Sequence, residues 1–411
     1  MEYYRYREFC LCSQGGAPPQ GALPAEGPFA PLVLLVSRDP FVSRGFFAIR
    51  SLAELDEPEG VNLLFAPTVP KADDGLTRFV EANGACVLNT AFARAFDILL
   101  AYRFYLSILP RVQIVGLGNV GGTMATGLKL LGPDLKEIGI FDHDRNLCLR
   151  YEAELNQILP VRDGERLPPV VIHSEDTLFD TDVLAFCAAR AVPEVGAESG
   201  SDVRLMQYEA NRDLLRGYAK RARECGFGGL FAQISDPVDQ LSRAVFLMSN
   251  QNERGDFDWR GLLPEQVRGF GLGVMRARAV YCAQREGILP EEIRAYGPHG
   301  SGLVIANAHG DSYDDEVSLE LTRRAETMNL QVRSYGFKPY IAPGLSSAAV
   351  SVLRAIRKEW QDAAVPMGGV YFGCRARFSE LGPETLREEP HPLLRKRIEK
   401  SYLALKGFNA K

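Results

Sequence analysis

The chain has 411 residues, of which 46% are hydrophobic, 24% charged and 9% aromatic, and its formal net charge is −5. This length exceeds one ordinary core, so two or three domains are expected. Charges of both signs are spread along the sequence, which argues against a nucleic-acid-binding surface, because such surfaces carry a basic patch or stripe. The short basic run at 395–397 lies in a helical pattern and is interpreted as a solvated helix face.

Targeting and metal-binding signals are not found in the sequence. No uncharged apolar run reaches the roughly 18 residues that a membrane-spanning helix needs. The first residues, MEYYRYREFC, lack the apolar core and cleavage site of a secretory signal. Of the eight cysteines only Cys10 and Cys12 are close together, and nothing nearby completes a metal site of the CxxC type. We therefore expect a cytoplasmic protein with reduced thiols and no metal, nucleic-acid or membrane partner.

The first 110 residues predict an added α/β region whose role the sequence does not reveal. Residues 13–31 are dense in Gly, Pro and Ala, which is typical of a flexible linker or turn-rich loop. Apolar runs then alternate with helix-like segments, and this alternation favours a mainly parallel sheet. The expected strands are Leu32–Val36, Val61–Phe65 and Cys86–Leu88, and the expected helices are Phe41–Leu55, Asp74–Ala82 and Ala91–Leu109.

From residue 111 the alternation of strands and helices is more regular, and it predicts a doubly wound, Rossmann-type parallel sheet. The longest expected helix stops at Gly226, as a helix ending in a C-terminal glycine should. The expected strands are Val112–Val115, Glu137–Phe141, Val183–Ala188 and Leu230–Ile234, and the expected helices are Gly121–Leu131 and Val203–Cys225.

The segment VQIVGLGNVGG predicts a dinucleotide-binding loop. Gly116, Gly118 and Gly121 follow a predicted strand in GxGxxG order and open a helix, whose free N–H groups suit a pyrophosphate. A lone GxGxxG is weak evidence and can be only a glycine-rich turn. Here Asp142 follows Gly121 by 21 residues (142 − 121), where a carboxylate binds ribose hydroxyls and repels a 2′-phosphate. We expect NAD rather than NADP, and the predicted contacts are Gly116, Gly118, Asn119, Val120, Gly121 and Asp142.

Several later segments resemble the lactate/malate dehydrogenase superfamily in order and spacing. Residues 226–239, GFGGLFAQISDPVD, are similar to the family's strand that ends in Asn-Pro-Val-Asp. Residues 271–281, GLGVMRARAVY, resemble its catalytic-helix motif, and residues 293–302, IRAYGPHGSG, resemble the segment that carries the catalytic histidine. The resemblance covers residues 111–411, and it implies an α+β catalytic domain after the Rossmann domain.

The resemblance also implies roles for individual residues. His299 would carry the proton of the substrate oxygen, Arg276 would hold the substrate carboxylate in a two-point fork, and Arg204 would polarise the carbonyl. Taken singly, each arginine could be a surface charge and the histidine a loop residue. His309, in NAHGDS, is a rival for the histidine, but His299 follows Arg276 by 23 residues (299 − 276), which is close to the family's separation.

The chain also departs from the family pattern. The aspartate that orients the family's histidine is replaced by Gly273, so His299 is expected to lack its partner. Asp236 stands in place of the Asn in the Asn-Pro-Val-Asp motif, near the expected nicotinamide and substrate, and disfavours a second negative charge there. A monocarboxylate substrate is therefore expected, with Arg190 as the one cation near the family's specificity position.

These observations lead to one working hypothesis and one alternative. Residues 1–110 are interpreted as an N-terminal extension, 111–245 as a Rossmann domain that binds NAD, and 246–411 as a catalytic domain. The first hypothesis is an NAD-dependent oxidoreductase that moves a hydride between NAD(H) and a 2-hydroxy or 2-keto monocarboxylate. The alternative is a non-catalytic NAD-binding regulator or sensor with the same fold. The resemblance further implies a homo-oligomer, either a dimer or a tetramer.

Overall fold

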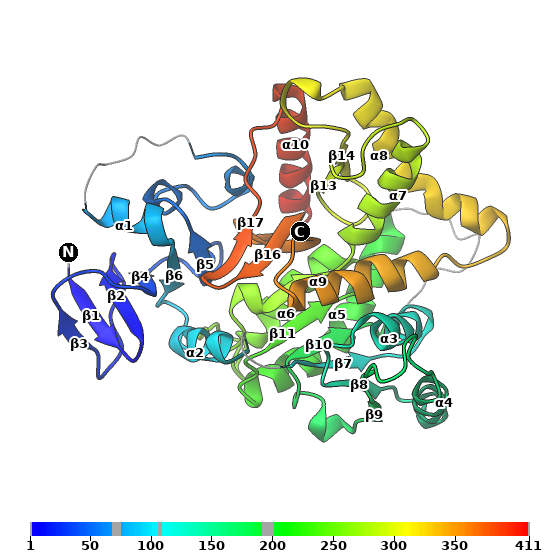
Figure 1. Cartoon of the computed structure of the whole chain (residues 1–411), viewed down its shortest axis with the longest axis horizontal. Helices are drawn as coiled ribbons and strands as arrows, with labels where there is room; N and C mark the ends of the chain where they lie inside the picture. The colour runs from blue at the N-terminus through cyan, green and yellow to red at the C-terminus, as the bar shows by residue number, and fades with distance from the viewer. Residues whose placement is uncertain (1, 68–74, 106–108, 191–200, 410–411) are drawn as a thin grey trace.

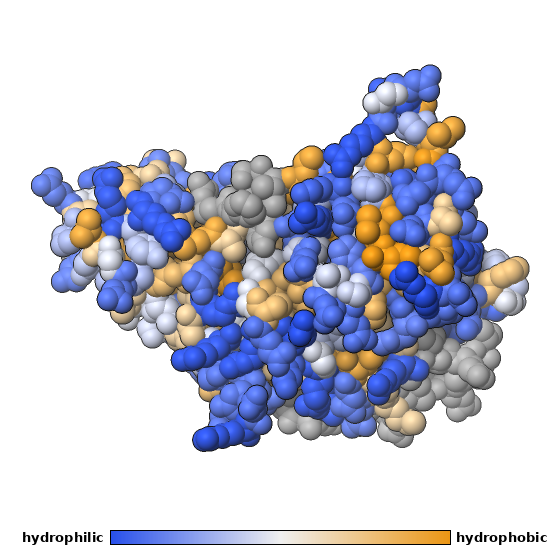
Figure 2. All heavy atoms as spheres, turned by 90° about the horizontal axis from the view of Figure 1, so that it is seen from below, coloured by the Kyte–Doolittle hydropathy of each residue, from blue (hydrophilic) through white to orange (hydrophobic). Residues whose placement is uncertain are grey.

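The computed structural model describes residues 2–67, 75–105, 109–190 and 201–409. Figure 1 shows an N-terminal region beside a central sheet, with the C-terminal helices packed against the opposite side. The face seen in Figure 2 is covered largely by hydrophilic residues, with smaller apolar areas between them. Within the described residues, no helix is long and apolar enough to cross a membrane.

The central sheet has nine strands in the order β17-β16-β15-β12-β11-β10-β7-β8-β9. The six strands from β12 to β9 are all parallel, and their order is the 3-2-1-4-5-6 order of doubly wound dinucleotide folds. The fold class expected from the sequence is therefore confirmed. These parallel strands are β7 (Arg111–Val115), β8 (Glu137–Phe141), β9 (Val170–Ile172), β10 (Val183–Phe186), β11 (Leu230–Gln233) and β12 (Val267–Gly269).

The strands β7, β8, β10 and β11 are buried almost throughout, as expected for a parallel sheet covered on both faces. Helices connect successive strands and supply that cover. The connecting helices are α3 (Asn119–Leu131), α4 (Arg145–Asn156), α5 (Ser201–Glu224) and α6 (Val238–Ser249), and short 3₁₀ turns lie at η3 (Glu175–Thr177) and η4 (Pro264–Gln266).

The C-terminal part extends the same sheet with antiparallel strands and covers it with helices. β15 (Gln361–Met367) joins β12, followed by β16 (Val370–Ser379) and β17 (Gly382–Thr385). A π-helical segment, η6 (Pro343–Val350), continues directly into helix α9. The other elements are α7 (Leu272–Gln284), β13 (Arg294–Tyr296), β14 (Val304–Ala306), η5 (Gly310–Ser312), α8 (Asp315–Ser334), α9 (Ser351–Ile356) and α10 (Pro392–Asn409).

The N-terminal region forms a second sheet of six strands in the order β3-β1-β2-β4-β6-β5. Only the pairs β2–β4 and β4–β6 are parallel, so the expectation of a mainly parallel sheet here is wrong. The strands are β1 (Tyr3–Tyr6), β2 (Phe9–Ser13), β3 (Leu23–Ala25), β4 (Leu32–Val36), β5 (Phe46–Ile49) and β6 (Ala85–Asn89), with helices α1 (Gly75–Asn83) and α2 (Ala95–Tyr105).

Three element predictions in this region are corrected by the structure. The expected helix Phe41–Leu55 contains strand β5 and the 3₁₀ turn η1 (Leu52–Glu54), because a short apolar run buried on both faces has no helical periodicity to distinguish it. The expected strand Val61–Phe65 is the 3₁₀ turn η2 (Val61–Leu64). The expected loop 13–31 includes β3, which pairs with β1.

The N-terminal sheet shares its core with the rest of the chain. One face, with Cys10 and Leu34, packs under α1, whereas the other face joins a large cluster that also contains Phe186 and Phe231 of the central sheet. Polar contacts reinforce this junction. Buried Glu265 accepts the backbone N–H groups of Gly45 and Phe46, and Arg387 pairs with Glu54 at 3.2 Å and with Glu57.

Candidate functional site

The glycine loop lies at the carboxyl end of β7, where the strand order of the sheet reverses. Gly116 has φ 89°, and a Cβ there would lie 2.7 Å from the backbone N of Ala188, which follows the neighbouring strand β10. A Cβ on Gly121 would lie 1.9 Å from the carbonyl oxygen of Gly116. By contrast, a Cβ on Gly118 meets no atom of the described residues within 4 Å. The predicted contacts Asn119 and Val120 form the start of α3.

This arrangement separates the tasks of the three glycines. Gly116 and Gly121 are required by close packing within the protein, whereas Gly118 borders open space in front of a helix N-terminus. Unpaired N–H groups and the helix dipole favour an anion at that place. The loop therefore fits a pyrophosphate, because backbone can approach the ligand over Gly118 without a side chain between them.

Asp142 follows β8 and reaches the glycine loop. Its Oδ2 accepts the backbone N–H of Leu117 at 2.7 Å, and its Oδ1 accepts that of Asp144 at 2.9 Å. A carboxylate has about four acceptor positions, so two backbone donors leave it able to accept ribose hydroxyls as well. The carboxylate is thereby fixed in the place where the sequence predicts the adenosine ribose.

His299 lies at the same carboxyl edge of the sheet and is held from two sides. Its backbone N–H donates to Oδ2 of buried Asp239 at 2.9 Å, and its Nδ1 lies 2.9 Å from the carbonyl oxygen of Gly271. Its Nε2 lies 3.7 Å from Oδ1 of Asp236. Because a carbonyl only accepts, Nδ1 carries a proton in this arrangement, and Nε2 is the nitrogen that can take up or give up another.

The orienting group of His299 is a backbone carbonyl, and Ser347 of η6 fixes that carbonyl. The Ser347 hydroxyl donates to the Gly271 oxygen at 2.7 Å and accepts the N–H of Val274 at 2.8 Å. Gly273 plays a different part from the one expected. A Cβ on Gly273 would lie 2.6 Å from the carbonyl oxygen of Ser346, whereas a Cβ on Gly271 would lie 2.9 Å from the imidazole Cγ. Gly273 thus faces η6 and not the histidine.

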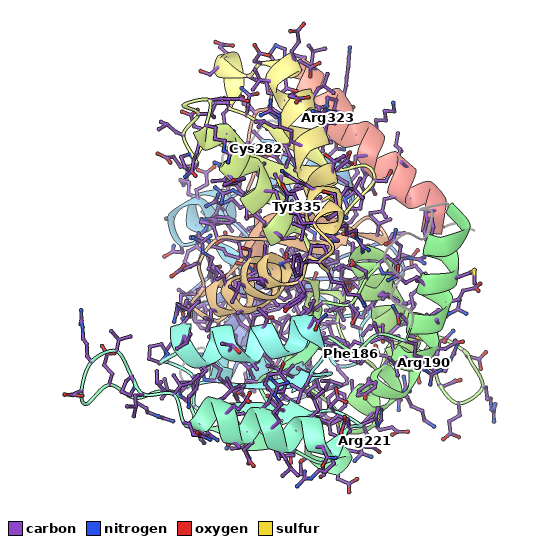
Figure 3. The ribbon with its side chains drawn as sticks, turned by 90° about the vertical axis from the view of Figure 1, so that its right-hand side faces the viewer. Phe186, Arg190, Arg221, Cys282, Arg323 and Tyr335 are labelled. Carbon is purple, nitrogen blue, oxygen red and sulfur yellow. The ribbon has the colours of Figure 1, made fainter. Side chains whose placement is uncertain are left out.

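Asp236 lies in the turn between β11 and α6 and stands in front of the imidazole with a half-exposed side chain. Its backbone oxygen accepts from the side-chain amide of Asn211, which is fully buried on α5, and Asn211 also accepts the backbone N–H of Arg190. Asn211 therefore ties the end of β11 to the end of β10. The Arg190 side chain is exposed, and Figure 3 shows it beside the green helices, near the end of β10 where Phe186 lies.

The two arginines of α7 differ in their surroundings. Arg276 donates from Nε to the carbonyl of Ile293 at 2.9 Å and from Nη2 to that of Pro290 at 2.8 Å, with Asp362 at 3.9 Å. Its guanidinium is thus engaged by the protein in this conformation. Arg278 donates from Nη1 to the carbonyl of Ala325 at 3.2 Å. Burial lowers the pKa of Arg278, and the carboxylate of Asp236 acts in the opposite direction.

Two further residues named from the sequence, Arg204 and His309, are not found beside His299 in the described part of the structure. The backbone of Arg204 is in the first turns of α5, but its side chain lies outside the described residues, as does the segment 191–200. The rival histidine, His309, has Nδ1 3.5 Å from Glu388, and burial lowers its pKa. Among the residues that the structure describes, no group of three or more His, Cys, Asp or Glu could hold a metal ion.

The fold and the glycine loop define a protein of the doubly wound Rossmann class. No family model matches the chain. The L-lactate dehydrogenase of Treponema denticola is 30% identical over 205 residues, which are 49% of this chain and 55% of that enzyme. The L-lactate dehydrogenase of Oceanobacillus iheyensis is 26% identical over 289 residues, which are 69% of this chain and 78% of that enzyme.

A solved structure agrees with these sequence relatives. The malate dehydrogenase of Archaeoglobus fulgidus, in complex with NADH, superposes with a TM-score of 0.59 at 18% identity and covers 73% of this chain and 98% of its own. At 18% identity this structural similarity shows that the two chains share a fold, and nothing further about function. Together the comparisons confirm the resemblance stated from the motifs, because the chain is similar to L-lactate dehydrogenases in sequence and to a malate dehydrogenase in fold.

Four residues that position the site are not identified by sequence reasoning. Asp239 is the second acid of Asp-Pro-Val-Asp, and its place in the first turn of the helix that follows β11 is the signal that the sequence offers for it. Gly271, Ser347 and Asn211 act through a backbone carbonyl, a hydroxyl and an amide whose partners are distant in sequence. Nothing in their local sequence distinguishes them from residues of ordinary helices and turns.

Proposed function

We propose that the chain binds NAD(H) with the pyrophosphate over Gly118 at the start of α3 and the adenosine ribose against Asp142. Three observations support this: the open space over Gly118, the fixed carboxylate of Asp142, and the likeness to a malate dehydrogenase solved with NADH. The negative charge of Asp142 disfavours the 2′-phosphate of NADP, so NAD is the expected cofactor.

The activity that we propose is an NAD-dependent oxidoreductase acting on a 2-hydroxy or 2-keto monocarboxylate. The observation that carries it is the fixed imidazole of His299, with Nδ1 on the Gly271 carbonyl and Nε2 directed toward a half-exposed carboxylate at the cofactor edge of the sheet. NAD would supply the hydride acceptor or donor. His299 would take the hydroxyl proton at Nε2 during oxidation and return it during reduction.

Asp236 has two expected effects on this chemistry. Its carboxylate would stabilise the imidazolium that forms when Nε2 takes up a proton. It would also repel a second negative charge on the substrate. At an effective dielectric of about 20, two like charges about 4 Å apart repel by roughly 4 kcal/mol, which is enough to exclude a dicarboxylate without a further cation. A monocarboxylate is therefore the substrate class proposed.

The substrate carboxylate requires a cation, and α7 offers two. Sequence resemblance assigns this role to Arg276, whose Nε and Nη2 are occupied by the carbonyls of Ile293 and Pro290. Within the described residues, Nε and Nη2 of Arg278 make no hydrogen bond, and its pKa responds to Asp236. We therefore favour Arg278 as the carboxylate ligand, with Arg276 holding the segment that leads to β13.

The test combines binding and turnover. NADH and NADPH titrations by fluorescence measure the cofactor preference, and NADH oxidation is then followed with pyruvate, longer 2-keto monocarboxylates and oxaloacetate. Arg278→Ala should raise KM for every active keto acid by about 100-fold while NADH binding is retained, since a charge-assisted fork contributes about 3 kcal/mol. Arg276→Ala is the matched control on the same helix. A larger KM effect for Arg276→Ala would restore the assignment made by resemblance.

One observation favours the alternative of a non-catalytic NAD-binding regulator or sensor. The nitrogen that would face the substrate lies next to a carboxylate, which competes for the same proton. Tight NADH binding without oxidation by any keto acid, in wild type and in Asp236→Asn, would support the regulator. We propose that either form is a cytoplasmic homo-oligomer, a dimer or tetramer, and light scattering coupled to size-exclusion chromatography measures its mass.

A further inference from the structure

A cavity of about 170 Å³ lies at the opposite edge of the sheet from the glycine loop, where the N-terminal region meets the other two regions. The amino ends of β10 and β11 contribute Val183 and Leu230, and the N-terminal region contributes Phe46 and Ile98. Phe378 of β16 and Ala355 of α9 close the remaining side. Apolar cavities of about 150 Å³ stay dry and accept molecules the size of benzene.

The polar groups in the wall of this cavity are already satisfied by the protein. Burial raises the pKa of Glu265 to about 8, so this carboxyl is largely uncharged at neutral pH. A molecule inside the cavity therefore meets few polar groups that require a partner from it, and its buried part is expected to be a hydrocarbon ring. The wall contacts are Glu265 with the N–H groups of Gly45 and Phe46, Tyr102 with the carbonyl of Ser379, and Gln266 with the carbonyls of Phe227 and Gly229.

Two charged side chains also line the cavity, and they differ in pairing. The ammonium of Lys358 pairs with Glu380. The carboxylate of Asp182 accepts only the backbone N–H of Arg111, at 2.6 Å, and within the described residues it has no ion pair. Burial raises the pKa of Asp182, because it removes water from the carboxylate, while the backbone N–H of Arg111 and the charges of Arg111 and Lys136 act in the opposite direction without an ion pair among the described residues. The charge that needs a complement is thus negative.

We propose that this cavity binds a small aromatic amine, with its ring among Phe46, Ile98 and Phe378 and its ammonium group against Asp182. Such a ligand matches both features of the cavity, a ring-sized apolar space and one lining carboxylate that forms no ion pair with the described residues. Because the cavity joins the N-terminal region to the central sheet, the ligand would stabilise that junction. The proposal is independent of the activity proposed for the opposite edge.

The role of the Asp182 charge is tested with three ligands of similar size that carry a positive charge, no charge or a negative charge. Benzylamine, toluene and benzoate are titrated into the whole chain by calorimetry at pH 7. Benzylamine should bind most tightly and benzoate most weakly. Asp182→Asn keeps an oxygen for the N–H of Arg111 but removes the charge. It should weaken benzylamine binding by about tenfold and leave toluene within about twofold. Equal affinity for all three probes, or none for any, would overturn the proposal.

The location is tested by filling the cavity. Ile98→Trp and, separately, Ala355→Leu should abolish benzylamine and toluene binding, because each adds side-chain volume to a different wall. Two variants are used so that misfolding of one does not decide the result. NADH affinity and circular dichroism serve as folding controls, since the cavity is lined by the amino ends of β10 and β11, whereas the glycine loop follows the carboxyl end of β7. If a well-folded filled variant still binds benzylamine like the wild type, the amine binds elsewhere.

Discussion

The imidazole Nδ1 of His299 lies 2.9 Å from the carbonyl oxygen of Gly271, so a backbone group performs the orienting task that the family assigns to an aspartate. The same oxygen accepts from Ser347 at 2.7 Å, which places η6 in direct contact with the group that fixes the histidine. π-Helical segments occur often at functional sites. Here the segment also packs on α3, where a Cβ on Gly344 would lie 2.6 Å from Thr123.

Ser347→Ala is therefore expected to act on the histidine from a distance. Loss of the hydroxyl frees the Gly271 carbonyl and deprives Val274 of its acceptor, so His299 is held less firmly. If the chain turns over a keto acid, kcat should fall by about tenfold while KM changes little, because orientation and not binding is affected. Ser351→Ala is the control, since Ser351 donates to Ser346 within the same segment. Equal losses in both variants would indicate a merely structural role.

For Gly273→Asp, the family resemblance and the structure predict opposite results. On resemblance alone, an aspartate there should supply the missing partner and raise the rate. The structure predicts the reverse, because the new Cβ would lie 2.6 Å from the backbone of Ser346 and from Oγ of Ser351. We expect destabilisation of about 1–3 kcal/mol and no gain in turnover, measured by thermal denaturation and by NADH oxidation. A stable variant with higher kcat would show that η6 yields and that the family arrangement can be rebuilt.

Gly118 and Gly121 should respond in opposite ways to an added side chain. Gly118→Val should weaken NADH binding by at least about tenfold with little change in the free energy of unfolding, because its Cβ meets no atom of the described residues within 4 Å. Gly121→Ala should lower stability, since its Cβ would lie 1.9 Å from the carbonyl of Gly116. Fluorescence titration and chemical denaturation measure the two quantities. Unchanged NADH affinity in Gly118→Val would remove the cofactor from this loop.

The raised pKa of Glu265 predicts the direction in which the stability of the fold changes with pH. Burial raises its pKa from 4.5 to about 8, so the folded chain keeps the proton after the unfolded chain has lost it. The stability contributed by this proton is therefore full below about pH 4.5 and is lost as the pH rises to about 8. Glu265→Gln keeps an oxygen for Gly45 and Phe46 and should flatten the curve of Tm against pH in this interval. A parallel curve in the variant would assign the slope to other groups.

Sequence reasoning succeeded where the signal was periodic and local. The sequence predicts the parallel strands β7, β8, β10 and β11 and the loop at Gly116–Gly121 within a few residues, because buried βα units have a strong pattern, whereas it gives no signal for the three-residue strand β9. The N-terminal region was harder. β5 is a four-residue apolar run, and its strand character comes from pairing with β6 and burial against the central sheet. Such tertiary contacts override local propensity.

The candidate site shows the same contrast between residues that local motifs identify and contacts that only the folded chain creates. His299 and Asp236 were named from motifs, and the structure brings them within 3.7 Å. The resemblance predicts that Gly273 is the empty partner position of His299, whereas a Cβ on Gly273 would face Ser346 and Ser351, because matched letters do not tell which way a helical residue faces. Arg276 and Arg278 lie two residues apart on α7, so about 200° separates their directions around the helix. Only the structure shows that Arg276 donates to two backbone carbonyls from Nε and Nη2, whereas Arg278 donates to one from Nη1.

The shared core described for the N-terminal sheet has a consequence for where the chain can be divided. Phe9, Leu11 and Leu35 belong to the same apolar cluster as Phe186 and Phe246, and so the boundary near residue 110 divides the sequence but not the hydrophobic interior. Truncation at this boundary would expose the apolar side chains of the central sheet that the N-terminal sheet covers. The two parts therefore depend on each other for burial, and each is expected to aggregate when it is produced alone.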